Sequence, residues 1–223
     1  MIHIHCTKKL FDKLPLDDDG RLPVKNSAVL QSDSQVVAGQ NPLSDWQGNL
    51  ITLQRRNCIL LVHEATRFPL LLPCLTKPDY RNLQWLFEDV LMNTLLKMGV
   101  SEQQMDTASR LLEPLVLDNR SDRSVMGTLN QMKGRLESLL WVDNANIQDL
   151  NAYRVSNWLA EAPCGIKGQS ESVWPNEAIL ELLDLAADKQ VTISVSVDDR
   201  RQQEQLPDNV VSMHHYRKTM ESK

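Results

Sequence analysis

Long apolar runs are missing from this sequence. No stretch approaches the roughly 18–20 residues of a membrane span, and the N-terminus MIHIHCTKKL alternates instead of forming the apolar core of a secretory signal. Four cysteines are present, Cys6, Cys58, Cys74 and Cys164. They include no C-x-x-C pair, which fits a reducing cytosol better than a disulfide framework. We therefore expect a cytoplasmic protein that does not cross a membrane.

Signatures of several catalytic classes are also missing. The eight glycines form no phosphate-binding loop, no G-x-S-x-G nucleophile elbow occurs, and no H-E-x-x-H or Cys/His cluster completes a zinc site. The pattern therefore indicates no cofactor. The net charge of −5, from 24 basic and 29 acidic residues, disfavours an extended nucleic-acid-binding groove. The charge does not exclude a small, localised nucleic-acid-binding site.

What is present is the composition of an ordinary globular protein, with 42% apolar and 24% charged residues over 223 positions. A domain of this size can bury a core without a disulfide or a metal. We expect one domain over residues 1–188, with strands within 2–72 and helices within 76–188. Residues 189–223 are expected to form a late strand and a polar, mobile tail.

The first part of the chain has the period of β-structure. Residues 2–6 alternate, which predicts a strand with His3 and His5 on one face. Residues 12–47 show little periodicity and predict a long loop. Three apolar runs then predict an antiparallel meander, at 50–53, 58–62 and 68–72. Pro69 cannot donate to a ladder and predicts that the last of these is an edge strand.

From Thr76 onward the apolar period changes to that of helices. Expected helix starts are Thr76 with Asp79, Ser101 with Gln104, Ser121 or Asp122, Asn146 with Asp149, and Pro175. Gly99 is the expected stop of the first helix, and Leu115 is placed in the second. Val191–Val197 alternates strongly and predicts a strand that could pair with its own sheet or with a second copy.

Strands followed by helices favour an α+β fold, a small antiparallel meander with a mostly helical C-terminal half packed on one face. Within the helix expected at 124–141, Gly127 and Gly134 each cost about 1 kcal/mol relative to alanine. We expect close packing against the sheet or a neighbouring helix to offset this cost.

The histidines give a weak metal signal. His3 and His5 share a strand face and could chelate an ion with His63 or Glu64 as a third ligand. No further ligand pattern supports such a site, so we expect partly exposed strand histidines and no metal.

Five arginines are the stronger candidates for a binding site, and they are Arg55, Arg56, Arg67, Arg120 and Arg123. Guanidinium groups near a helix start can hold phosphate or carboxylate. If these arginines hold a phosphate-containing substrate, His63 or Glu64 would be the acid or base. The alternative is that they are solvated or form salt bridges.

Several blocks occur in a recognisable order, Cys6-Thr7-Lys8-Lys9, Trp46-Gln47-Gly48-Asn49-Leu50, Arg55-Arg56-Asn57-Cys58, Thr76-Lys77-Pro78-Asp79-Tyr80 and residues 119–130, NRSDRSVMGTLN. Over residues 1–165 the chain resembles an uncharacterised bacterial family known as a domain of unknown function. The resemblance implies a bacterial cytosolic protein and carries no catalytic residue.

These observations lead to three hypotheses. The first is a non-catalytic interaction or regulatory protein that binds a protein partner or forms a homodimer. The second is a small enzyme that acts on a phosphate-containing substrate held by the arginine cluster. The third, which is not favoured, is a localised nucleic-acid binder.

Overall fold

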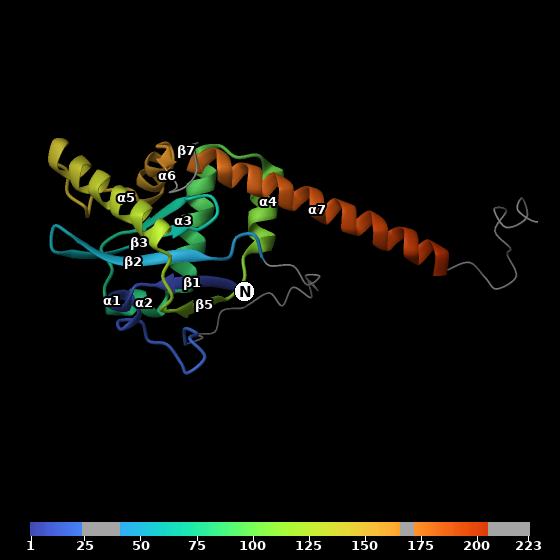
Figure 1. Cartoon of the computed structure of the whole chain (residues 1–223), viewed down its shortest axis with the longest axis horizontal. Coiled ribbons are helices and arrows are strands. Elements are labelled where there is room, and N and C mark those ends of the chain that lie inside the picture. The colour runs from blue at the N-terminus through green and yellow to red at the C-terminus, as the bar shows by residue number, and fades with distance from the viewer. Residues whose placement is uncertain (24–40, 166–171, 205–223) are drawn as a thin grey trace, which may run out of the picture. The chain divides into compact units, whose positions relative to one another are not determined.

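The computed structural model of the chain describes residues 1–23, 41–165 and 172–204 (Figure 1). The chain forms two units, Met1–Asp184 and Leu185–Lys223. All strands of the described residues lie in the first unit. No helix among the described residues combines the length and the apolar character needed to cross a membrane.

Two expectations fall partly or wholly outside the described residues. The loop expected at 12–47 is described only at 12–23 and 41–47. The end of the tail expected within 189–223, from residue 205 onward, also lies outside the described residues.

A five-stranded mixed sheet forms the centre of the first unit. Its strands are β1 (Ile2–Cys6), β2 (Trp46–Leu53), β3 (Arg56–His63), β4 (Pro69–Leu72) and β5 (Leu115–Asp118), in the order β4-β3-β2-β1-β5. The expected antiparallel meander is confirmed as β2-β3-β4, and β4 is an edge strand. The strand expected at 2–6 is also confirmed, but it pairs in parallel with both β2 and β5.

Seven helices and a small hairpin complete the described structure. The helices are α1 (Lys8–Phe11), α2 (Lys77–Arg81), α3 (Leu83–Met98), α4 (Glu102–Leu111), α5 (Arg123–Val142), α6 (Ala152–Ala160) and α7 (Pro175–Glu204). The hairpin pairs β6 (Cys164–Gly165) with β7 (Ser172–Val173). The α+β class expected from the sequence is confirmed.

Several helix ends lie where the sequence places them. Ser101 and Gln104 form a reciprocal capping box at the start of α4, and the Asp122 carboxylate accepts from the Val125 backbone N–H at the start of α5. Gly99 ends α3 in the left-handed region at φ 74°. Such signals are readable because each joins residues only a few positions apart.

Two expected boundaries are wrong. Leu115 lies in β5 rather than in a helix. Pro114, which follows α4, disfavours helical backbone in the residue before it. The carbonyl of Pro114 accepts a hydrogen bond from Ile2 N at 3.1 Å, which joins this segment to the sheet. Asn151, not Asn146, caps α6, with its Oδ1 accepting from Arg154 N at 2.9 Å. The Asn146 side chain instead accepts from Gln148 N within a turn.

The late strand expected at Val191–Val197 is also wrong, because these residues lie inside α7. The helix begins at Pro175, and neither glycine nor a second proline occurs before Pro207. Once nucleated, a helix gains one backbone hydrogen bond for each added residue. A period-two pattern of valines and serines does not by itself interrupt that propagation.

Helices cover both faces of the sheet, not the single face expected. One core cluster joins Ile4 and Leu61 to Phe87 of α3, whereas a second joins Leu60 to Leu129 of α5. The unbroken apolar run of β3 is the sequence signal for this arrangement, since a strand buried on both faces does not alternate. The backbone N–H of Leu71, on edge strand β4, is covered by α6 through a hydrogen bond to Ser156 Oγ at 2.9 Å.

The glycines of α5 do not pack as expected. A Cβ built on Gly127 or Gly134 meets nothing within 4 Å, and both residues are exposed. Close approach of another segment of the described structure therefore does not explain them.

Candidate functional site

A row of three polar side chains crosses the parallel part of the sheet. His5 of β1 is in register with Asp118 of β5 on one side and with Gln47 of β2 on the other. Side chains alternate along a strand, and Ile4 and Cys6 point into the core cluster beneath α3. The polar row therefore points to the opposite face, toward the start of α5.

His5 lies between two carboxylates. Its Nδ1 is 2.8 Å from Asp118 Oδ1 and its Nε2 is 3.4 Å from Asp45 Oδ1, while the residue is only 7% exposed. Asp118 also accepts from the backbone N (2.9 Å) and Nε (2.7 Å) of Arg120. Burial alone would raise the pKa of Asp118, but the hydrogen bonds from His5 and Arg120 outweigh it and lower that pKa.

Gln47 ties this row to the loop that precedes α5. It is fully buried, and its side-chain amide donates to the backbone carbonyls of His5 and Arg120, the latter at 3.2 Å. Its Oε1 accepts from Asp122 N at 2.7 Å. One buried side chain thus makes hydrogen bonds to three backbone groups next to the core.

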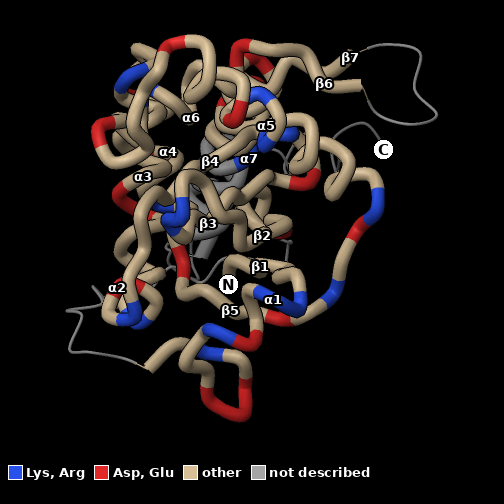
Figure 2. Tube along the Cα trace, turned by 90° about the vertical axis from the view of Figure 1, so that its left-hand side faces the viewer, with Lys and Arg blue, Asp and Glu red and all other residues tan. Residues whose placement is uncertain are grey.

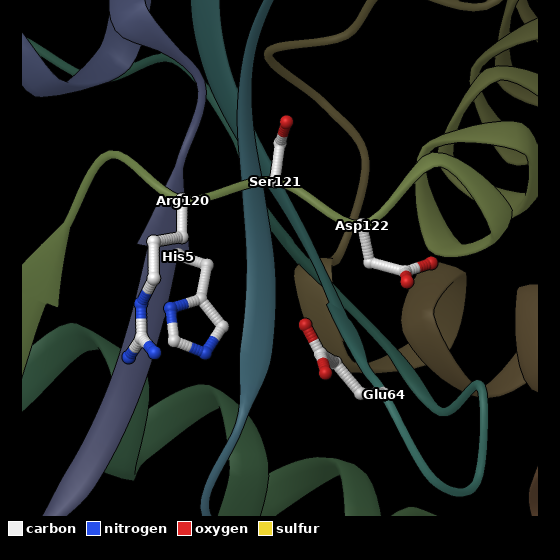
Figure 3. A pocket seen from close by; sticks show the side chains of 5 residues that line it. All are labelled: His5, Glu64, Arg120, Ser121 and Asp122. Atoms are coloured by element: carbon white, nitrogen blue, oxygen red, sulfur yellow. The ribbon is translucent and has the colours of Figure 1, made fainter.

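A pocket of about 190 Å³ opens above His5 (Figure 3). It is lined by His5, Glu64, Arg120, Ser121 and Asp122. The Glu64 carboxylate extends from the β3–β4 turn into the space between His5 and Asp122, and Arg120 lies alongside the His5 ring. Ser121 supplies the only hydroxyl among these lining residues, and it points away from His5.

The electrostatics of the pocket favour protons and cations over anions. Burial raises the pKa of Glu64, and the nearby carboxylates of Asp45 and Asp122 raise it further, whereas His5 and Arg67 act against the shift. Arg120, the one guanidinium of the lining, is already paired with a carboxylate. The Glu64 and Asp122 carboxylates, beside a guanidinium that is already paired, disfavour the binding of an anion in this pocket.

Arg67 lies close to this pocket without lining it. It is 5% exposed, and its Nη2 donates to Ser124 Oγ at 3.2 Å. Its Nε and Nη1 are buried and make no hydrogen bond. Burial lowers the pKa of Arg67, while the charges of Asp122 and Glu64 oppose that shift. Arg67 therefore acts on the pocket through its charge.

The other predicted acid/base residue, His63, lies elsewhere. It pairs with Trp46 on the face of the sheet opposite His5 and is 1% exposed. Its Nε2 is 2.9 Å from Ser44 O and its Nδ1 is 2.8 Å from Thr66 Oγ1. Because a carbonyl only accepts, Nε2 carries the proton, and burial lowers the pKa of His63 to about 4. The residue is a neutral structural histidine.

The five candidate arginines do not converge on one site. Arg55 and Arg56 lie at the tip of the β2–β3 hairpin, where Gln148, with its amide oxygen turned toward Arg56, accepts from that guanidinium at 2.6 and 2.8 Å. Arg123 is exposed in the first turn of α5. Of the five, Arg120 alone lines the pocket.

The structure brings no third metal ligand to His3 and His5 among the described residues. The rings of His3 and His5 lie 6.4 Å apart. Within the described residues, no group of three or more His, Cys, Asp or Glu side chains is placed to hold an ion.

Residues 3–178 match a family model described as Domain of unknown function (DUF6933). The chain belongs to this family. The expected resemblance to a domain family of unknown function is thereby confirmed. No curated protein and no solved structure matches the chain. The DUF6933 region contains the sheet strands from His3 onward and helices α1–α6, so the His5 pocket lies entirely inside it.

Sequence reasoning on this DUF6933 protein missed Gln47, Asp118 and Asp122 as parts of a site. Gln47 stands out in the sequence only as a polar residue in an apolar strand. Asp118 follows Leu115, which the sequence pattern places in a helix and not in a strand. Their shared role depends on strand pairing across 42 to 113 positions, which a single sequence does not reveal.

Proposed function

We propose that this protein is a non-catalytic interaction protein that binds a protein partner through the far end of α5. The observation that carries the proposal is the exposure of two adjacent apolar residues, Trp141 at 85% and Val142 at 77%. Tryptophan in this setting is the residue type most enriched at interface hot spots. The two side chains are adjacent in the sequence and exposed at the end of one helix, so a partner can contact both together.

The hairpin arginines belong to the same end of the molecule. Gln54 Nε2 at the tip of the β2–β3 hairpin donates to Ala145 O at 2.9 Å, and Gln54 Oε1 accepts from Ile147 N at 2.8 Å. These bonds join the hairpin tip to the turn after α5, and both extend to the left in Figure 1. We call the set of Trp141, Val142, Arg55 and Arg56 the distal surface.

The composition of the distal surface fits a protein partner. Arginine and tryptophan are enriched at the centres of protein interfaces. Figure 2 faces this end of the molecule and shows basic and acidic residues interspersed along the described trace, without a large patch of one sign. Gly127 and Gly134 of α5 are exposed and lie fourteen and seven residues before Trp141, on the same helix face. Because they carry no side chains, a partner backbone can approach this face closely.

The test compares three forms of the full chain. The first is unchanged, the second carries Trp141→Ser with Val142→Ser, and the third carries Trp85→Ser, a matched control because Trp85 is 62% exposed on α3. Each is used for affinity capture from cell extract and for light scattering across a range of concentrations. A partner, or a dimer, that is present with the unchanged chain and the control but lost in the double variant supports the proposal. Identical partner sets and masses for all three forms contradict it.

The two other hypotheses draw less support. A phosphate-directed enzyme needs the arginines together, but Arg120 alone lines the His5 pocket and Glu64 and Asp122 repel an anion there. A nucleic-acid binder needs a basic surface, and the protein carries a net charge of −5. A bacterial cytoplasmic setting is part of the proposal, and the four free cysteines are consistent with it.

A further inference from the structure

A second and larger hollow lies between the end of α3 and α6. Its volume is about 770 Å³, within the roughly 300–1,000 Å³ typical of small-molecule sites. We call it the Trp158 groove, and its lining residues are Lys97, Asn151, Arg154, Asn157, Trp158 and Glu161. None of these residues belongs to the distal surface or to the His5 pocket.

The groove is locally basic in an acidic protein. Lys97 and Arg154 are both exposed, and neither forms an ion pair with any described residue. Glu161 is the only acidic residue of the lining, and its Oε1 accepts from Asn157 Nδ2 at 3.2 Å. Lys97 and Arg154 line one groove without an ion-pair partner among the described residues, so they are suited to bind an anionic group of a ligand.

Trp158 gives the groove an aromatic surface of fixed orientation. The Arg135 guanidinium lies 4.4 Å from the centre of the indole, and its Nη1 donates to Leu159 O at 3.1 Å. Arg135 does not line the groove, whereas Trp158 does. Arg135 covers one side of the indole, and the half-buried ring also packs against the second core cluster. The part of the ring that lines the groove supplies an apolar wall beside the two cations.

The polar groups are ordered along one helix face. Arg154 and Trp158 of α6 and Glu161, the residue that caps its C-terminus, are spaced by four and then three residues, which places them in a row along one helix face. Seven residues of helix span about 10 Å. Along α6 the lining therefore runs from Arg154 through Trp158 to Glu161, over a length comparable to that of a nucleotide.

We propose that the Trp158 groove binds a nucleoside monophosphate. The phosphate pairs with the cations of the lining, Arg154 and Lys97, the base contacts the lining part of Trp158, and the base edge donates a hydrogen bond toward Glu161. Each part of the groove then meets a group of matching chemistry, and the Asn157 and Asn151 amides offer further hydrogen bonds to the sugar.

The test is calorimetric titration of the full chain with four probes of the class, AMP, GMP, CMP and UMP, and with adenosine and inorganic phosphate as partial ligands. We expect at least one nucleotide with an exocyclic amino group to bind at least tenfold more tightly than either partial ligand. Binding of inorganic phosphate as tight as that of every nucleotide would overturn the role of Trp158. Absence of binding by all four nucleotides at millimolar concentration would overturn the proposal.

Variants locate the site. Arg154→Ala and Lys97→Ala are each expected to weaken nucleotide binding about tenfold, and both positions are exposed, so folding is retained. Arg81→Ala, at an exposed arginine at the end of α2, is the matched control. The Trp141→Ser, Val142→Ser variant is expected to bind nucleotide normally, which separates this inference from the proposed function. Affinities unchanged by both Arg154→Ala and Lys97→Ala would refute the assignment.

Discussion

At the scale of single residues, the two histidines singled out by the sequence have opposite environments. His5 lies between the carboxylates of Asp118 and Asp45 at the bottom of a pocket, whereas His63 is enclosed by a carbonyl and a hydroxyl on the other face of the sheet. The sequence distinguishes them poorly because both are histidines in apolar strands. The carboxylates beside His5 and the Ser44 carbonyl beside His63 come from other segments of the chain.

Protonation of His63 makes stability depend on pH. Its pKa is about 4 in the folded chain and about 6.5 in the unfolded chain, so the unfolded chain takes up the proton first. The contribution is therefore complete above about pH 6.5 and is lost as pH falls toward 4, by at most about 3 kcal/mol. Urea unfolding at pH 7 and pH 4.5 measures this loss. The variant His63→Gln is expected to lose less stability over that interval, and an equal loss in both proteins would contradict the account.

Arg67 is expected to tune Glu64. Its positive charge opposes the upward shift of the Glu64 pKa, so Arg67→Met raises that pKa further. Carboxyl-carbon NMR titration of Glu64 in the full chain measures the change. Arg56→Met, at the hairpin tip, is the control and leaves the pKa of Glu64 where it was. A Glu64 titration that Arg67→Met does not alter would show that the guanidinium is electrostatically remote from the pocket.

At the scale of elements, two exposed glycines on the outward face of α5 lower its helix propensity. Gly127→Ala and Gly134→Ala are each expected to raise the free energy of unfolding by about 1 kcal/mol, because the added Cβ meets nothing within 4 Å. Thermal unfolding should show an increase in Tm of about 2–4 °C for each. Gly48→Ala is the contrasting control, since its Cβ would lie 3.1 Å from Leu10 and Leu61 side-chain atoms, and it lowers Tm. A decrease in Tm for the α5 variants would mean that the outward face is packed.

The helical state of residues 191–197 is also testable. Ser194→Pro removes a backbone donor from the interior of α7 and is expected to reduce the helical signal in far-ultraviolet circular dichroism. Ser194→Ala is the control and retains or increases that signal. A spectrum that Ser194→Pro leaves unchanged would instead support the strand that the alternating pattern suggests.

At the scale of the whole molecule, both core clusters of the described residues lie in the first unit. Both core clusters end by Leu183, and the unit itself ends at Asp184. A chain that ends at Asp188 is therefore expected to unfold in one cooperative transition with a Tm within about 4 °C of the full chain. Differential scanning calorimetry makes the comparison. Broad, non-cooperative unfolding of the shorter chain would show that the second unit is needed for the core.

The sequence by itself determined the local features of this protein. The capping residues at Ser101 and Asp122, the stop at Gly99 and the alternation of residues 2–6 all depend on neighbours at most a few positions away. The same local information supports the α+β class. It misjudged residues 191–197 because alternation and helix propagation compete there, and the local pattern does not decide between them.

Only the tertiary structure decided the sites. The parallel pairing of β1 with β2 and β5 brings Asp118, His5 and Gln47 into one row, and the pocket then adds Glu64 from the β3–β4 turn. Which strands pair, and in which register, depends on how the apolar faces of distant segments pack together. That packing is a property of the whole chain, which is why the arginines that look like one cluster in the sequence are divided between the two ends of α5.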